Sequence, residues 1–236
     1  MLNRNITLIV HYILDNLIPP IFRDNKWLMR LFIKIAYGSY TDAVMEFKGK
    51  YPFMSEDEIS NYYELTKDAP INKRESDLNT TCLNYILENI VGESVLDAAC
   101  GRGALLKKIQ INDPSKELCG ADIVLNEHID QKWKGRFVQS SICTLPFDDC
   151  GFDTVICTHA LEHIRDYKKA IGELFRIAKK RLIIVVPKQR EYQYTPDFHI
   201  HFFPYLYSFK AFIGIEDANY FELKGDFLCV VDRKED

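Results

Sequence analysis

The sequence lacks the excess of basic residues that marks proteins whose main work is binding nucleic acid. Its 236 residues hold 30 Lys and Arg against 34 Asp and Glu, which gives a formal net charge of −4 and a pI of about 5.9. Because neutralising a phosphate backbone needs a basic face, we expect no nucleic-acid partner. The 47% of hydrophobic residues is ordinary for globular proteins and is enough for one large domain with an appendage.

The sequence also lacks the C-x-x-C spacing of zinc sites and redox motifs. Its seven cysteines are an odd number and are scattered, several of them inside apolar runs. They are Cys82, Cys100, Cys119, Cys143, Cys150, Cys157 and Cys229. This pattern is typical of reduced core cysteines, so we expect a cytoplasmic protein with no disulfide framework and no metal site.

No hydrophobic run is long enough to span a membrane. The run Ile6–Leu14 is short, Asp15 interrupts it, and no small-residue cleavage site follows, so we expect neither a removed signal nor a spanning helix. After the helix-breaking Ile18–Pro20, Lys26, Arg30 and Lys34 recur every four residues and share one helical face. Residues 1–35 therefore allow a peripheral membrane contact, or a helix packed on the rest of the chain or on a second copy in a homodimer.

Two domains are expected: a helical N-terminal extension over residues 1–75 and a second domain over residues 76–236. Helical spacing recurs over Ser55–Leu65 and Ser76–Ile90. Five short runs that follow are typical of strands: Ser94–Ala98, Leu118–Ile123, Arg136–Gln139, Thr154–Thr158 and Arg181–Pro187. Helical patterns lie between or after them, over Gly103–Ile111, Glu127–Trp133, Tyr167–Lys180 and Ser208–Ala218.

The alternation of strand and helix predicts an α/β fold with helices on both faces of a parallel sheet. The final stretch, Asn219–Lys234, is typical of two strands around a tight Lys-Gly-Asp turn, so the last strand should run antiparallel to its neighbour. We therefore predict a doubly wound, mostly parallel sheet of seven strands with an antiparallel last strand.

A glycine-rich turn joins the first strand to the first helix of this sheet. Such a turn lets a ligand approach the backbone and presents unpaired N–H groups to it. The phosphate-binding P-loop is excluded, because no Gly-Lys-Ser/Thr follows Gly101 and Gly103. A nicotinamide dinucleotide is disfavoured, because Leu106 occupies the third glycine position of its fingerprint and Asp97 would repel a pyrophosphate. An acid before the turn suits a ligand that carries a cation, such as the ammonium of an amino acid.

The stretch VLDAACGRGALL resembles the first motif of class I S-adenosylmethionine-dependent methyltransferases of the small-molecule, type 11-like group. The later stretches LCGADI, LPFDDCGFDTVIC, THALEHIRD and RLIIVVP resemble the family's later landmarks in the same order. The resemblance covers roughly residues 92–234. It implies a Rossmann-like fold and S-adenosylmethionine as the cofactor.

The resemblance also implies which residues bind the cofactor. The methionine end would lie on Asp97, Ala98, Ala99, Gly101 and Gly103. The ribose hydroxyls would be held by Asp122 and the adenine by Ile123, Ser141 and Ile142, with Thr158 completing the site. Ala99 replaces the family's glycine, which is a mild change if its φ is negative, and Ser141 replaces its frequent aspartate. Helix capping is the alternative role for Asp97 and Asp122.

Methylation of a hydroxyl requires a group that removes its proton, and histidine is the usual candidate. His199 and His201 lie in an aromatic-rich stretch after the fifth strand, and His159 lies at the tip of the fourth. The letters HALEH also fit a zinc-protease pattern, but their place directly after a parallel strand argues against a metal.

We therefore expect an enzyme that transfers a methyl group to a small-molecule, sugar or glycan-intermediate acceptor, on oxygen. The N-terminal extension would cover the cofactor and help to select the acceptor. The alternatives are an N-methyltransferase and a non-catalytic partner subunit that binds the cofactor.

Overall fold

The computed structural model describes residues 12–66, 69, 76–124, 135–195 and 197–233. The chain forms two compact units, one of residues 1–77 and 189–204, the other of residues 78–188 and 205–236. The first break lies two residues from the expected boundary. Residues 189–204, which the expected domain 76–236 included, group instead with the N-terminal unit.

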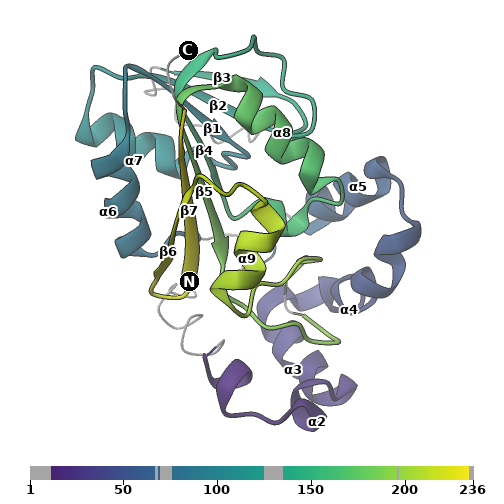
Figure 1. Cartoon of the computed structure of the whole chain (residues 1–236). Coiled ribbons are helices and arrows are strands. Elements are labelled where there is room, and N and C mark those ends of the chain that lie inside the picture. The colour runs from purple at the N-terminus through teal and green to yellow at the C-terminus, as the bar shows by residue number, and fades with distance from the viewer. Residues whose placement is uncertain (1–11, 67–68, 70–75, 125–134, 196, 234–236) are drawn as a thin grey trace. The chain divides into compact units, whose positions relative to one another are not determined.

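The larger unit is built on a seven-stranded sheet with the order β3-β2-β1-β4-β5-β7-β6 (Figure 1). The strands are β1 (Ser94–Ala98), β2 (Glu117–Asp122), β3 (Arg136–Gln139), β4 (Phe152–Thr158), β5 (Ala178–Pro187), β6 (Asn219–Leu223) and β7 (Asp226–Asp232). Strands β1 to β5 pair in parallel, and β7 lies antiparallel between β5 and β6. The predicted sheet with an antiparallel last strand is confirmed.

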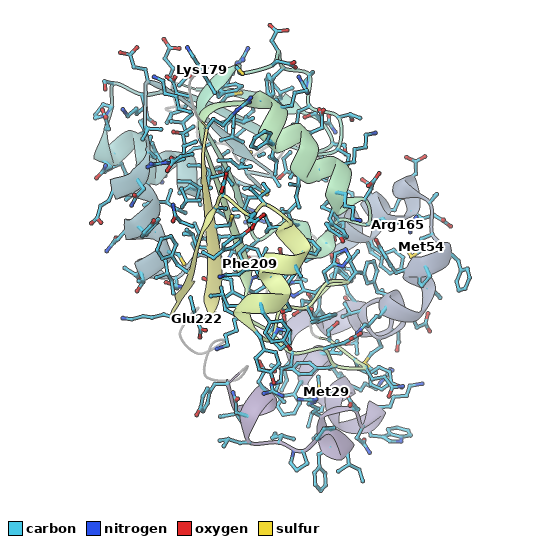
Figure 2. All side chains as sticks on the ribbon, viewed as in Figure 1. Met29, Met54, Arg165, Lys179, Phe209 and Glu222 are labelled. Atoms are coloured by element: carbon cyan, nitrogen blue, oxygen red, sulfur yellow. The ribbon has the colours of Figure 1, made fainter. Side chains whose placement is uncertain are left out.

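Helices cover both faces of this sheet, as in a doubly wound fold. Figure 1 shows α6 (Thr80–Asn89) and α7 (Ala104–Asn112) on one face, and α8 (Tyr167–Ile177) and α9 (Leu206–Ile213) on the other. The first pair contributes Ile86 and Leu106 to a core with Ile183 and Val185 of β5. On the second face Phe209, labelled in Figure 2, stacks on Phe227 with 5.9 Å between ring centroids.

Two predicted helices end earlier in the structure than the sequence suggests. The helix expected over Ser208–Ala218 stops at Ile213, because Gly214 adopts a left-handed conformation that terminates it. The helix expected to reach Lys180 stops at Ile177, because β5 begins at Ala178, opposite Phe152 of β4. The helix expected over Glu127–Trp133 lies outside the described residues.

The smaller unit is helical, as the sequence predicts. Residues 12–16 are helical, followed by α2 (Pro20–Arg23), α3 (Lys26–Tyr37), α4 (Thr41–Lys50) and α5 (Glu56–Thr66). Pro20 occupies the first position of α2, where a missing N–H costs nothing. Asn25 begins α3 by accepting hydrogen bonds from the N–H groups of Trp27 and Leu28. Within the described ranges, no helix has both the length and the apolar character needed to cross a membrane.

Residues 189–204 pack against these helices through Phe198. Its buried ring lies 4.5 Å from the ring centroid of Phe47 and 6.0 Å from that of Tyr37, and Tyr62 and Tyr63 meet it edge-on. Such aromatic contacts contribute about 0.5–1.5 kcal/mol each beyond the buried area. This cluster explains why the segment belongs to the N-terminal unit.

Candidate functional site

The residues expected to bind the cofactor gather at one edge of the sheet. Asp97 and Ala98 end β1, Asp122 ends β2 and Thr158 ends β4. Parallel strands place their carboxyl ends at a common edge, where α/β proteins bind ligands. Ser141 and Ile142 lie at the same edge, because the N–H of Ser140, directly after β3, donates to the Asp122 carbonyl at 2.9 Å. The structure therefore brings these parts of the predicted site together.

Asp97 is a buried acid with unused hydrogen-bonding capacity. It is 2% exposed, and its Oδ1 has no hydrogen-bond partner among the described residues. Burial, and next the nearby charge of Asp122, raise the pKa of Asp97 to about 8. Leaving a carboxylate buried without a partner is costly, and a cation placed against it would remove that cost. The group therefore suits a ligand with an ammonium.

The turn after β1 takes three left-handed residues. Ala99, Gly101 and Gly103 have φ values of 64°, 55° and 72°. A Cβ at Gly103 would lie 2.9 Å from the ring of Phe137, whereas a Cβ at Gly101 would meet open space. Gly101 therefore leaves room for a ligand to approach the backbone. Ala99 therefore does not have the negative φ under which this replacement of glycine would be mild, and an L-residue is strained at a positive φ.

Asp122 holds the glycine turn in place. The N–H of Gly101 donates to its Oδ2 at 2.7 Å, and the N–H of Val124 donates to its Oδ1 at 3.0 Å. A carboxylate accepts about four hydrogen bonds, so it retains capacity for a ligand. Burial raises the pKa of Asp122, against the effect of the backbone donors. Helix α7 begins at Ala104, and its N-cap Gly103 provides no side-chain cap, so Asp97 does not cap this helix.

The residues expected near an adenine ring differ in their exposure and in their hydrogen bonds. Ile123 is 44% exposed and offers apolar surface next to Asp122. The Oγ of Ser141 accepts a hydrogen bond from the N–H of Cys143 at 3.2 Å, and the side chain of Ile142 is buried. Ser141 therefore serves the local turn after β3.

His159, at the tip of β4, lies between two buried carboxylates. Its Nε2 lies 3.5 Å from Oδ1 of Asp226, and its Nδ1 lies 3.6 Å from Oε1 of Glu162. Burial alone would lower the pKa of His159, but the two carboxylates outweigh it and raise the pKa to about 9. The ring is therefore an imidazolium at neutral pH. Its φ of 52° is held by an N–H that donates to the carbonyl of Val185 at 2.9 Å.

Sequence reasoning predicted neither this cluster of carboxylates around His159 nor Asn79, which joins it. Asn79 caps α6 by accepting from the N–H of Cys82 at 2.9 Å, and its Nδ2 donates to Oδ2 of Asp226 at 2.6 Å. The signal in the sequence was an asparagine just before a helical pattern, which predicts the cap but not the carboxylate. The network connects α6, β4 and the start of β7.

His199 belongs to the other unit, where a chain of hydrogen bonds fixes its tautomer. Gln189 donates from Nε2 to Oδ2 of Asp197 at 3.0 Å, so its Oε1 faces Nδ1 of His199 at 2.6 Å. That arrangement puts the proton on Nδ1 and the lone pair on Nε2. His201, the other candidate in this stretch, is half-buried.

Residues 96–186 match the family model described as a methyltransferase domain. The demethylmenaquinone methyltransferase of Thermus thermophilus is 32% identical over 90 residues, which are 35% of this chain and 41% of that protein. An uncharacterized protein of Methanocaldococcus jannaschii is 39% identical over 94 residues, 39% of this chain and 40% of that one. Residues 96–186 therefore make up a methyltransferase domain. The chain spans about two fifths of the length of these relatives.

The methyltransferase domain also has the expected fold. A solved S-adenosylmethionine-dependent methyltransferase from Aquifex aeolicus superposes with a TM-score of 0.50 at 15% identity, covering 75% of this chain and 97% of that one. The matched residues 96–186 begin within β1 and end within β5, so they contain Asp97, the turn, Asp122 and His159. The segment 189–204 lies outside them.

The match to a methyltransferase domain implies S-adenosylmethionine as the cofactor, and the residues at the sheet edge fit it. The buried Oδ1 of Asp97 has no partner in the described part of the chain, as a site for an ammonium requires. Gly101 faces open space where a Cβ would otherwise stand, and Asp122 keeps acceptor capacity at the end of β2. The fit rests on charge, space and hydrogen-bonding capacity.

Proposed function

We propose that this protein is a methyltransferase that methylates an oxygen of a small-molecule, sugar or glycan-intermediate acceptor. The observation that carries the proposal is the buried carboxylate of Asp97, whose Oδ1 has no partner among the described residues. A group of this kind, directly before a left-handed glycine turn, is suited to the amino-acid ammonium of S-adenosylmethionine and not to a pyrophosphate.

The same edge supplies the other contacts that the cofactor needs. Asp122 would accept the ribose hydroxyls in charge-assisted hydrogen bonds, and Ile123 would lie against the adenine. Ala98, Ala99 and Gly101 would line the methionine end with backbone. The remaining predicted contacts are Gly103, Ser141, Ile142 and Thr158. When bound, S-adenosylmethionine supplies an electrophilic methyl group on its sulfonium.

His199 is the proposed general base. With the proton on Nδ1, which faces Oε1 of Gln189 at 2.6 Å, Nε2 would be the ring nitrogen that accepts the proton of an acceptor hydroxyl. Asp197, whose Oδ2 lies 3.5 Å from Nδ1, would stabilise the imidazolium that results. His159 is unsuited to this role, because a ring with a pKa of about 9 is already protonated at neutral pH. We assign His159 to positioning the tip of β4.

The choice of oxygen as acceptor rests on two features of the sequence. The stretch Thr195–Phe209 combines histidines with aromatic side chains suited to an uncharged ring or sugar, and Thr158–Leu161 lacks the Asn-Pro-Pro-Tyr type of motif that binds amino groups. Demethylmenaquinone belongs among the acceptors to be tested, because the Thermus relative is named for it.

Two measurements test the proposal. Calorimetry should show binding of S-adenosylmethionine and S-adenosylhomocysteine but not of NAD, and failure to bind either sulfur compound would refute the assignment of the site. A screen with methyl-labelled cofactor should then identify an acceptor labelled on oxygen. Labelling on nitrogen would select the N-methyltransferase alternative, and binding without turnover on any acceptor would select a partner subunit.

With an acceptor in hand, His199→Gln should lower kcat by about 10²–10⁴-fold and remove the acidic limb of the pH profile. The matched variant His201→Gln should retain activity within a factor of about three on the same reasoning. The reverse pattern would move the base to His201. Full activity in both variants would show that neither histidine is required.

A further inference from the structure

Helix α3 has two apolar faces, and only one of them is covered by residues that the structure describes. Met29, labelled in Figure 2, and Ile33 are fully buried on the inner face. On the outer face Trp27, Leu31 and Ile35 stand one turn apart and are 82%, 58% and 66% exposed. Successive residues at this spacing form one continuous row. Exposed apolar rows of this kind mark interaction surfaces.

A row of basic residues runs beside the apolar one. Lys26, Arg30 and Lys34 each precede a member of the apolar row by one residue, so they lie about 100° around the helix from it. Arg30 pairs with Asp42 at 2.6 Å, but no described acidic side chain pairs with Lys26 or Lys34. Helix α3 contains no acidic residue. The outer surface of α3 therefore carries exposed apolar side chains next to positively charged ones.

The residues just before α3 extend the apolar surface of this unit. Leu17, Ile21 and Phe22 are exposed, the last two on α2. With Trp27, Leu31 and Ile35 they form what we call the outer apolar row. Six large apolar side chains within residues 17–35 expose more apolar surface than the scattered single residues usual on a monomer.

We propose that the outer apolar row and the basic residues beside it dock on an anionic membrane surface. Tryptophan prefers the boundary between headgroups and acyl chains, and lysine and arginine beside it attract anionic headgroups. A second copy of the chain is a poorer occupant, because it would bring two basic rows together without an acidic residue on α3 to pair with them. The proposal does not depend on the proposed reaction.

Cosedimentation of the full chain with vesicles tests this proposal. Vesicles of about three parts phosphatidylcholine to one part phosphatidylglycerol should bind the protein at least about tenfold more strongly than pure phosphatidylcholine. Raising sodium chloride from about 0.05 M to about 0.5 M should weaken binding, because salt screens the attraction. Equal binding to both vesicles, or none to either, would overturn the proposal.

Paired variants identify the surface. Trp27→Ser with Leu31→Ser should reduce binding to the anionic vesicles by about tenfold or more, and Lys26→Gln with Lys34→Gln by about fivefold or more. The matched controls are Phe53→Ser, which removes an exposed aromatic outside the row, and Lys107→Gln with Lys108→Gln, which removes two exposed lysines of α7. Controls that lose as much binding as the test variants would overturn the proposal.

Two further readouts separate this surface from a dimer interface. With Trp133→Phe as background, Trp27 is the one remaining tryptophan, and its fluorescence should shift to the blue when anionic vesicles are added. Analytical ultracentrifugation of the wild type and of the Trp27→Ser, Leu31→Ser variant should give the same mass. A dimer that this variant dissociates, with no binding of the wild type to vesicles, would show that a second copy covers the row.

Discussion

Ala99 offers a test of strain inside the candidate cofactor turn. Its φ of 64° places a methyl-bearing residue where glycine is normally used, at a cost of about 1–2 kcal/mol. Replacement by glycine removes that strain but adds freedom to the unfolded chain, which costs about 0.4–1 kcal/mol. It also removes a half-buried methyl group worth about 0.4 kcal/mol, half of a fully buried one. Ala99→Gly should therefore stabilise the protein slightly, by about 0.5 kcal/mol on these values.

The decisive measurement compares Ala99→Gly with a matched variant, Ala104→Gly. Ala104 is also half-buried, but it is the first residue of α7 and has helical backbone. The cost of the added freedom in the unfolded chain and the cost of the lost methyl group are therefore similar in the two variants. The difference in stability between the two variants then reports the left-handed strain alone. We expect Ala99→Gly to be more stable than Ala104→Gly by about 1–2 kcal/mol, or about 2–8 °C in Tm for a chain of this size.

Thermal unfolding followed by circular dichroism, with urea unfolding as a second method, measures both variants against the wild type. Equal destabilisation by the two substitutions would refute the reasoning, because it would mean that Ala99 stores no strain. A larger loss in Ala99→Gly than in Ala104→Gly would also refute it, and would mean that the methyl of Ala99 makes a contact worth more than its burial indicates.

Three further predictions concern buried polar groups. Asp97→Asn should weaken S-adenosylmethionine binding by about 30-fold or more, because it removes the carboxylate proposed to face the ammonium, and it should not lower stability at neutral pH, because Asp97 with a pKa of about 8 is mostly protonated there; calorimetry and urea unfolding measure the two effects. His159→Gln should lower the free energy of unfolding by about 3–5 kcal/mol, because it leaves Asp226 and Glu162 without the cation between them, and adding Asp226→Asn should restore part of the loss. Asn79→Ala should cost about 2–3 kcal/mol in urea unfolding, since it removes a helix cap and a donor to a buried carboxylate, whereas a cost below about 0.5 kcal/mol would contradict the network.

The strands were predictable from the sequence because their signals are local. The bounds of β1 and β3 match the prediction, since a short apolar run between polar or glycine residues is itself the pattern of a buried strand. The ends of α8 and α9 were not predictable in this way, because α8 ends where β5 begins and α9 ends at the left-handed Gly214. Helical periodicity continues past such points in the sequence.

The candidate site was predictable only where it is contiguous or lies at a strand end. Asp97, the turn and Asp122 follow from the order of strands in a parallel sheet. The cluster around His159 could not be foreseen, because Asn79 and Asp226 come from segments far apart in the chain and meet only through the placement of β7 beside β5. The sign of φ at Ala99 likewise depends on the folded turn and could not be predicted from the residue types in it.

The buried groups at the sheet edge make the pH dependence of cofactor binding a test of how the site works. The pKa of Asp97 is about 8 in the ligand-free fold against about 3.8 in an exposed carboxyl, so between these values the folded state holds a proton that the unfolded chain has lost. Its contribution to stability is therefore present below about pH 4 and is lost as the pH rises toward 8.

An ammonium bound to Asp97 reverses that dependence, because it requires the ionised carboxylate. Binding of S-adenosylmethionine below pH 8 should release a proton, and the affinity should rise up to about pH 8 and then level off. Between about pH 6.5 and 9 the folded state carries a proton on His159 that the unfolded chain has lost. Because its partners are protein carboxylates, its effect on stability should be the same with and without cofactor. In Asp97→Asn the proton release, measured in buffers of different ionisation enthalpy, should vanish. Its persistence in that variant would assign the linked proton to another group and would remove Asp97 from the role proposed for it.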